Sequence, residues 1–181
     1  MNKLKYLLFL IPVIGVFFFS SFNNKTKTVT SENVVWHTDM KIATEMAKKQ
    51  DKPLLLFFTG SDWCGWCIRL QKEVLKTPEF EAWAKDKVIL VDLDFPRRTE
   101  QPAEIKTQNA QLQQVFGIQG FPTIWFAKVG AKDGKVNLEQ LGSTGYVAGG
   151  PAAWLTGANE IVAKYIPNNT KKVKKVKKVK A

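Results

Sequence analysis

The chain has 181 residues, of which 45% are hydrophobic, so it can bury the core of one sizeable domain. Its formal net charge of +11 at pH 7 would suit a nucleic-acid or membrane partner. However, seven lysines lie between Lys171 and Lys180 and two more are Lys3 and Lys5, and removing these nine from +11 leaves only +2. The central part is therefore not basic, and we expect no nucleic-acid partner.

Residues 1–22 are predicted to form a signal peptide or an N-terminal membrane anchor. Two lysines precede an apolar run from residue 6 to 19 that carries no charge. A cleavage site after this run is poor, because Phe18 or Phe19 would occupy the position that prefers a small residue. Both alternatives stay open, and either one indicates an exported protein. Residues 23–33 follow as a polar linker.

A domain is expected over residues 34–166, and it opens with a strand, a helix and a second strand. Residues 34–36 are a short apolar run, and Thr38 or Asp39 can cap the helix that follows. An apolar stripe predicts this helix, and it consists of Met40, Ala43, Met46 and Ala47. Residues 54–58 are then an unbroken apolar run with the length of a buried strand.

Two cysteines, Cys64 and Cys67, follow this strand. Cys67, Leu70 and Val74 recur at helical spacing, so the pair lies where a buried strand gives way to a helix. The first turn of a helix exposes N–H groups and a partial positive charge, which stabilise a thiolate and make Cys64 a nucleophile at neutral pH. Cys67 can then attack the mixed disulfide that Cys64 forms. We predict thiol–disulfide exchange, with Cys64 exposed and Cys67 more buried.

Other interpretations of the pair are weaker. A structural zinc site usually needs four ligands, and the chain offers two cysteines and one histidine, His37. His37 directly precedes a predicted helix cap, and we interpret it as structural. A purely structural disulfide across so short a loop would constrain little of the unfolded chain. We expect neither a metal nor an organic cofactor.

A further helix and strand follow the cysteines. Thr77 and Pro78 have the pattern of an N-cap and the first turn of a helix. Residues 88–91 form a second apolar run of strand length. Asp92 and Asp94 end this strand, and because no further ligands are nearby we interpret them as a solvated strand end and not as a metal site.

The next segment is polar. Residues 96–106 are punctuated by prolines, and we interpret them as a tolerated surface insertion. From Gln108 onward the pattern predicts a helix that Gly117 terminates. Its apolar residues are Leu112, Val115 and Phe116.

Gly120-Phe121-Pro122-Thr123 leads into the last part of the domain. Strands are predicted over residues 124–129 and 136–141, joined by a turn. Glycines between residues 142 and 150 make a flexible connection, and Pro151 begins the last helix. The alternation of strands and helices indicates an α/β fold.

Two of these motifs resemble one known family. The segment from Phe57 to Cys67, with a tryptophan directly before the first cysteine, resembles the active site of exported bacterial thioredoxin-like proteins. The Phe121-Pro122 motif agrees, because in that family a proline at this place is cis and lies beside the redox pair. The resemblance covers roughly residues 34–166. It implies the thioredoxin-like fold, a central mixed β-sheet flanked by helices on both faces.

The resemblance also implies an exported thiol–disulfide oxidoreductase, either periplasmic or anchored in the membrane and facing the periplasm. Cys64 would attack protein disulfides and Cys67 would resolve the mixed disulfide, while a redox partner protein exchanges electrons with the pair. The surface around Cys64 would bind substrate through Trp63, Gly65, Trp66, Phe121 and Pro122. The direction of electron flow stays open. The alternative is a non-catalytic binding or chaperone-like module, although the two cysteines and Pro122 argue against it.

The chain departs from this family at two acidic positions. Many relatives place an acid on the strand before the active-site loop, and the matching residue here is Phe57 or Phe58. Exported relatives often carry a glutamate one turn after the second cysteine, where this chain has Gln71. None of these three side chains can accept a proton, so we expect Cys67 to deprotonate poorly and to limit the resolving step near neutral pH.

Residues 167–181 are predicted to form a basic tail. It contains a threefold Lys-Lys-Val repeat over residues 171–179. A period of three suits neither a helix face nor a strand face, and so many like charges favour a disordered, solvated tail. The functional alternative is electrostatic attachment of Lys171–Lys180 to an anionic membrane surface.

Overall fold

The computed structural model describes residues 34–132 and 134–168. The predicted signal segment, the linker and the lysine-rich repeat lie outside the described residues. Within these two ranges, no helix is both long enough and apolar enough to cross a membrane.

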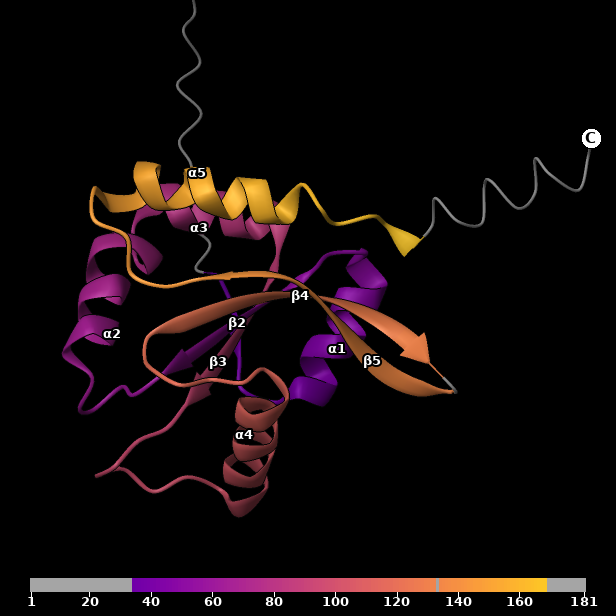
Figure 1. Cartoon of the computed structure of the whole chain (residues 1–181), viewed down its shortest axis with the longest axis horizontal. Helices are drawn as coiled ribbons and strands as arrows, with labels where there is room; N and C mark the ends of the chain where they lie inside the picture. Colours follow the sequence, from indigo (N-terminus) through magenta and orange to yellow (C-terminus); the bar gives the residue numbers. More distant parts are fainter. Residues whose placement is uncertain (1–33, 133, 169–181) are drawn as a thin grey trace, which may run out of the picture. The chain divides into compact units, whose positions relative to one another are not determined.

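Five strands form one mixed sheet in the order β1-β3-β2-β4-β5 (Figure 1). The strands are β1 (Trp36–His37), β2 (Leu54–Thr59), β3 (Ile89–Asp94), β4 (Thr123–Lys132) and β5 (Lys135–Thr144). Strand β3 pairs in parallel with β1 and β2, whereas β4 pairs antiparallel with β2 and β5. Every residue of β2 is buried, as expected of a strand that is paired on both edges and covered on both faces.

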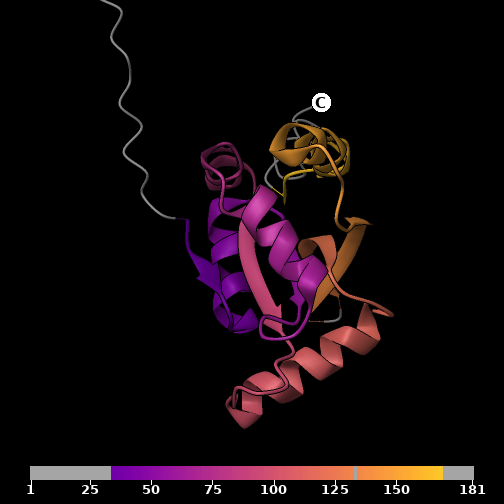
Figure 2. The same cartoon turned by 90° about the vertical axis from the view of Figure 1, so that its left-hand side faces the viewer.

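Helices cover both faces of the sheet (Figures 1 and 2). The helical elements are α1 (Met40–Gln50), α2 (Gly65–Leu70), the π-helical turn η1 (Gln71–Leu75), α3 (Pro78–Lys87), α4 (Ala103–Val115) and α5 (Gly150–Val162). Along β2, Leu55 and Phe57 belong to the core shared with α2, η1, α3 and α5, while Leu56 and Phe58 belong to the core beneath α1 and α4. The predicted mixed sheet with helices on both faces is confirmed.

Two helix caps lie where the sequence predicts them. Asp39 caps α1, and its carboxylate accepts a hydrogen bond from the Lys41 N–H at 2.7 Å. Thr77 caps α3, and its hydroxyl accepts from the Phe80 N–H at 3.3 Å. Each cap satisfies an N–H that the helix itself leaves unpaired.

The start of α4 and the place of β1 differ from the prediction. Helix α4 begins at Ala103, five residues before the predicted start at Gln108. The sequence pattern missed this first part of the helix because it carries no apolar stripe. Its buried residue is polar, since Asn109 donates from its amide to the Asp94 carbonyl at 2.9 Å. Val115, predicted on the apolar face, is 64% exposed. Strand β1 is Trp36–His37 instead of residues 34–36, because only these two residues pair with β3.

Strand β3 continues through both of its aspartates. Phe57 of β2 pairs with Asp92, and Thr59 pairs with Asp94, so hydrogen bonding to β2 extends the strand past its apolar run. Asp92 is mostly buried, and within the described part of the chain its Oδ1 atom has no hydrogen-bond partner. The interpretation of a solvated strand end is therefore wrong for Asp92.

Candidate active site

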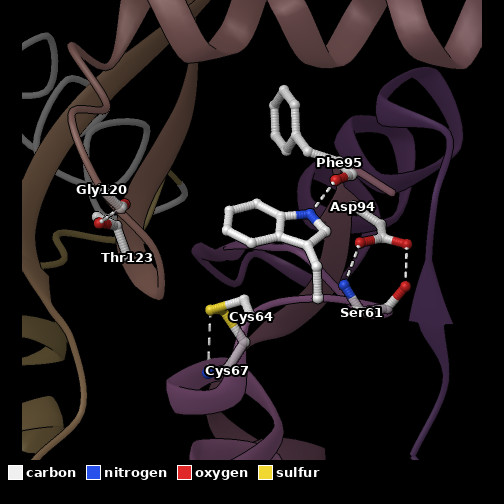
Figure 3. The surroundings of a disulfide bond; sticks show 8 residues. Ser61, Cys64, Cys67, Asp94, Phe95, Gly120 and Thr123 are labelled. Carbon is white, nitrogen blue, oxygen red and sulfur yellow. Dashed lines mark hydrogen bonds between the residues drawn. A yellow bond between two sulfur atoms is a disulfide. The ribbon is translucent and has the colours of Figure 1, made fainter. Parts of the chain in front are cut away.

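The loop between β2 and α2 is anchored at both ends. The Gly60 carbonyl accepts a hydrogen bond from the Cys64 N–H at 2.9 Å. Ser61 donates to the Asp94 carboxylate through its N–H at 2.8 Å and through its hydroxyl at 2.6 Å (Figure 3). Because Asp94 ends β3, these bonds fix the loop to the neighbouring strand and set the position from which α2 starts.

The two cysteines lie at the start of α2, as predicted. Cys64 is the N-cap, and Cys67 lies in the first helical turns. Their sulfurs form a disulfide, with the two Cα atoms 5.2 Å apart (Figure 3). The Cys67 N–H donates to Cys64 Sγ at 3.2 Å. In the reduced protein the same N–H and the positive end of the helix would stabilise a thiolate on Cys64.

The burial of the two cysteines is only partly as predicted. Cys67 is completely buried and Cys64 retains 6% of its surface, so the expected order is confirmed. The expectation that Cys64 is exposed is wrong, because the large side chains of Trp63 and Phe121 pack against the core cluster that contains both cysteines. Aromatic side chains therefore restrict access to Cys64.

Trp63 is fixed by residues far from it in sequence. Its indole N–H donates to the Phe95 carbonyl at 2.8 Å (Figure 3). The Arg97 guanidinium lies 3.8 Å from the centre of the Trp63 ring, a cation–π contact. The Phe121 ring meets Trp63 edge-on, at 5.6 Å between centroids. Trp63 therefore joins the active-site loop to the segment after β3 and to the Phe121-Pro122 motif.

Asp62 ties the segment after β3 to the active-site loop. Its carboxylate accepts hydrogen bonds from the N–H groups of Arg97, Arg98 and Thr99, the shortest at 2.7 Å. These bonds, that of Arg97 foremost, lower the pKa of Asp62 below its usual value. Residues 96–99 are thus part of the architecture around Trp63, and not merely a tolerated insertion.

The Phe121-Pro122 peptide bond is cis, as the resemblance implies. Figure 3 shows the turn from Gly120 to Thr123 across from the disulfide, and the Thr123 hydroxyl closes it by donating to the Gly120 carbonyl at 2.8 Å. A Cβ added to Gly145 would lie 3.3 Å from the Pro122 carbonyl, so the connection between β5 and α5 runs close behind this turn.

A second polar and aromatic cluster supports Trp66. The Trp66 side chain is 55% exposed, and its ring lies 5.1 Å from that of Tyr146. The Arg69 guanidinium lies near both rings, at 5.3 Å and 5.0 Å from their centres. Glu73 pairs with Arg69 at 2.8 Å and accepts from the Tyr146 hydroxyl at 2.6 Å. The Tyr146 hydrogen bond, and then that of Arg69, lower the pKa of Glu73.

Of the five predicted substrate-binding residues, Trp63, Trp66 and Phe121 therefore make defined ring contacts. Pro122 lies in the cis turn across from the disulfide (Figure 3), and Gly65 lies exposed at the start of α2. Sequence reasoning missed the residues that hold them, namely Asp62, Phe95, Arg97, Arg69, Glu73 and Tyr146. Only Arg69 and Glu73 carried a sequence signal, because residues four apart on a helix can pair. Among the described residues, no group of three or more histidine, cysteine or acidic side chains could hold a metal ion.

A disulfide-forming cysteine pair at the start of a helix, facing a cis-proline turn on a mixed sheet, defines a thiol–disulfide oxidoreductase of thioredoxin-like fold. In agreement, the thioredoxin-like domain family matches residues 40–149, and the chain belongs to this family.

The relatives of this chain include named redox proteins. It is 35% identical over 132 residues to the disulfide bond reductase DsbH of Chlamydia pneumoniae, covering 73% of this chain and 75% of DsbH. It is 37% identical over 92 residues to the thioredoxin-related protein DsbJ of the same organism, but spans only 26% of that longer protein. A solved structure of DsbH oxidoreductase superposes with a TM-score of 0.67 at 33% identity, covering 77% of this chain and 91% of that one. A thioredoxin from Thermus thermophilus shares the fold, with a TM-score of 0.53 at 18% identity.

Proposed function

We propose that this oxidoreductase reduces disulfides of exported proteins, with Cys64 as the attacking thiolate and Cys67 as the resolving thiol. The observation that carries the assignment of roles is the asymmetry of the pair. Cys64 caps α2 and receives the Cys67 N–H, whereas Cys67 is completely buried behind it. The reductive direction is supported by the name of the relative DsbH, a disulfide bond reductase.

The reaction has two exchange steps. The Cys64 thiolate attacks one sulfur of the substrate disulfide, a bond forms between them, and the substrate disulfide breaks with its electron pair on the second sulfur, which takes up a proton. Cys67 then attacks Cys64 Sγ, the internal disulfide forms, and the substrate leaves as a dithiol. Two electrons pass to the substrate, and a thiol partner protein must reduce the internal disulfide again.

The substrate would bind over Trp63, Gly65, Trp66 and the Phe121-Pro122 turn. Gly65 supports this role because no atom lies within 4 Å of the position of an added Cβ, so a substrate chain can approach its backbone closely. Pro122 has no backbone N–H to donate. An extended substrate peptide would therefore form its hydrogen bonds with the backbone groups of the residues next to Pro122. The exposed Trp66 and Ile68 add an apolar rim.

We also propose that the protein is exported. The predicted N-terminal signal or anchor segment supports this, and export would place the protein in a compartment in which substrate disulfides persist. We further propose that the basic tail attaches the protein to anionic membrane surfaces, where each lysine near the surface contributes about 1 kcal/mol.

A trapping experiment tests the assignment of Cys64 and Cys67. The Cys67→Ser variant should accumulate mixed disulfides with protein substrates, because the resolving thiol is missing. The matched Cys64→Ser variant should accumulate none, and the wild-type protein should reduce insulin disulfides. Equal trapping by both variants would overturn the assignment of roles, and no reduction of insulin would overturn the reductive direction.

A further inference from the structure

The family's buried acid is absent from β2, but an acid lies next to the vacant position on the adjacent strand. Phe57 of β2 pairs directly with Asp92 of β3. Paired residues of neighbouring strands project to the same face of a sheet. For Phe57 that face is the one covered by α2, because Phe57 and Cys67 belong to the same core cluster. Asp92 therefore lies one strand away from the expected position and on the side of the cysteines.

A pocket lies between Asp92 and the π-helical turn η1, which directly follows the helix of Cys67. It has a volume of about 180 Å³, and its lining residues are Trp36, Phe57, Gln71, Leu75, Lys76 and Asp92. Gln71 lies one turn after Cys67, and its backbone N–H bonds to the Cys67 carbonyl. The pocket thus extends from Asp92 to Gln71, the residue whose N–H bonds to the Cys67 carbonyl, and Cys67 itself is not among its lining residues.

Two buried polar atoms on this side of the sheet lack partners in the described chain. They are Asp92 Oδ1 and Thr59 Oγ1. Thr59 lies two residues after Phe57 on β2, so it projects to the same face. Unpaired buried polar atoms are unfavourable, and water molecules commonly satisfy them where there is room. A pocket of this volume can hold water, and such water can bond the unpaired carboxyl oxygen of Asp92.

We propose that Asp92 accepts the proton of the Cys67 thiol through water in this pocket during the resolving step. The inference rests on the proposed role of Cys67 as the resolving cysteine. It replaces the expectation that the resolving step lacks an acid altogether.

The proton and electron balance is simple. The Cys67 S–H bond breaks, its proton passes through water to the Asp92 carboxylate, and its electron pair forms the bond to Cys64 Sγ. The bond between Cys64 and the substrate breaks, and the substrate sulfur leaves with that electron pair. Asp92, now neutral, returns its proton to solvent through the pocket.

The electrostatic setting suits a proton acceptor near neutral pH. Burial, and secondarily the negative charge of Asp94, raise the pKa of Asp92 to about 6. The other charged group of the pocket is Lys76, which is exposed at its rim. From β1, β2 and η1 the groups facing Asp92 are Trp36, Phe57 and Gln71, which do not titrate in this range. A carboxylate with a pKa of about 6 can take up a proton and release it again near neutral pH.

Stopped-flow measurement of mixed-disulfide decay tests the proposal. In the wild-type protein the resolving rate should rise as pH increases through about 6, as Asp92 becomes charged. Asp92→Asn should lower this rate about tenfold or more at neutral pH and remove the rise. The control Asp86→Asn removes an exposed carboxylate from α3 and should leave the rate and its profile unchanged.

The outcomes separate this inference from the proposed function. A wild-type rate and pH profile in Asp92→Asn, or a rate lowered equally at every pH, would overturn the role of Asp92 alone. A failure of the Cys67→Ser variant to form mixed disulfides would instead overturn the proposed function.

A second measurement needs no variant. Carbon-13 NMR of the Asp92 carboxyl group should show its titration moving to higher pH by about half a unit or more on reduction, because the reduced cysteines are electrostatically coupled to it. Identical titration in both redox states would also overturn the proposal.

Discussion

Replacing Asp92 with asparagine should stabilise the oxidised protein at neutral pH. Burial raises the pKa of Asp92 from 3.8 to about 6, and the negative charge of Asp94 adds to this effect. Above pH 6 the folded protein must therefore hold a charged, mostly buried carboxylate, whereas the unfolded chain exposes it to water. Asparagine has nearly the same shape and carries no charge, so the variant avoids this cost.

The magnitude follows from the difference between the folded and unfolded pKa values of Asp92. A difference of about two units corresponds to about 3 kcal/mol, since one unit is worth about 1.4 kcal/mol. Between the unfolded and folded pKa values the folded protein binds the proton and the unfolded chain does not, so wild-type stability falls as pH rises through this window. The advantage of Asp92→Asn should thus be near zero below about pH 4 and reach about 3 kcal/mol above about pH 7.

Urea unfolding of the oxidised proteins, followed by tryptophan fluorescence between about pH 4 and pH 8, measures this advantage. In the oxidised state neither cysteine titrates, so the pH dependence of the difference belongs to Asp92. Asp86→Asn, which removes an exposed charge, should show no comparable dependence. The reasoning is refuted if Asp92→Asn differs from the wild type by the same free energy at the two ends of the range, or if it is less stable at neutral pH.

Three further predictions concern the loop, the pocket and the tail. Gly60→Ala should destabilise the protein by about 1–3 kcal/mol in urea unfolding, because the new Cβ would overlap the Trp63 indole. The control Gly65→Ala, whose Cβ meets no atom within 4 Å, should change stability far less, and equal effects of the two variants would contradict this. Gln71→Glu should speed mixed-disulfide decay at pH values at which the new carboxylate is ionised. It should also restore part of the rate lost in Asp92→Asn, because residue 71 lines the same pocket. A folded double variant as slow as Asp92→Asn would argue against proton transfer in this pocket. Deleting residues 171–181 should abolish binding to anionic vesicles and leave the reduction of a small disulfide unchanged. Vesicle binding by the full chain should fall steeply as the salt concentration rises. Vesicle binding that survives the deletion would exclude the tail as the site of attachment.

The features that sequence predicted correctly depend on local chemistry. A cap such as Thr77 is specified by a side chain and the N–H groups a few residues on, and the place of Cys64 at a helix start follows from the apolar pattern on either side of it. The missed features depend on contacts distant in sequence. Helix α4 begins early although its buried residue is the polar Asn109, and Trp63 is held by a carbonyl 32 residues away. The periodicity of apolar residues along the sequence does not predict such long-range contacts.

Asp92 illustrates the same limit at the level of mechanism. In the linear sequence, the position of the family's acid falls on β2, where this chain has Phe57. The sequence alone therefore indicates that the acid is missing. Across the sheet, the register places Asp92 directly beside Phe57, about 5 Å away at the usual spacing of paired strands. Water in the adjoining pocket can bridge polar groups that are too far apart for a direct hydrogen bond. A buried proton acceptor can therefore lie on the neighbouring strand and still face the same side of the sheet, and only the pairing of the strands reveals such a candidate.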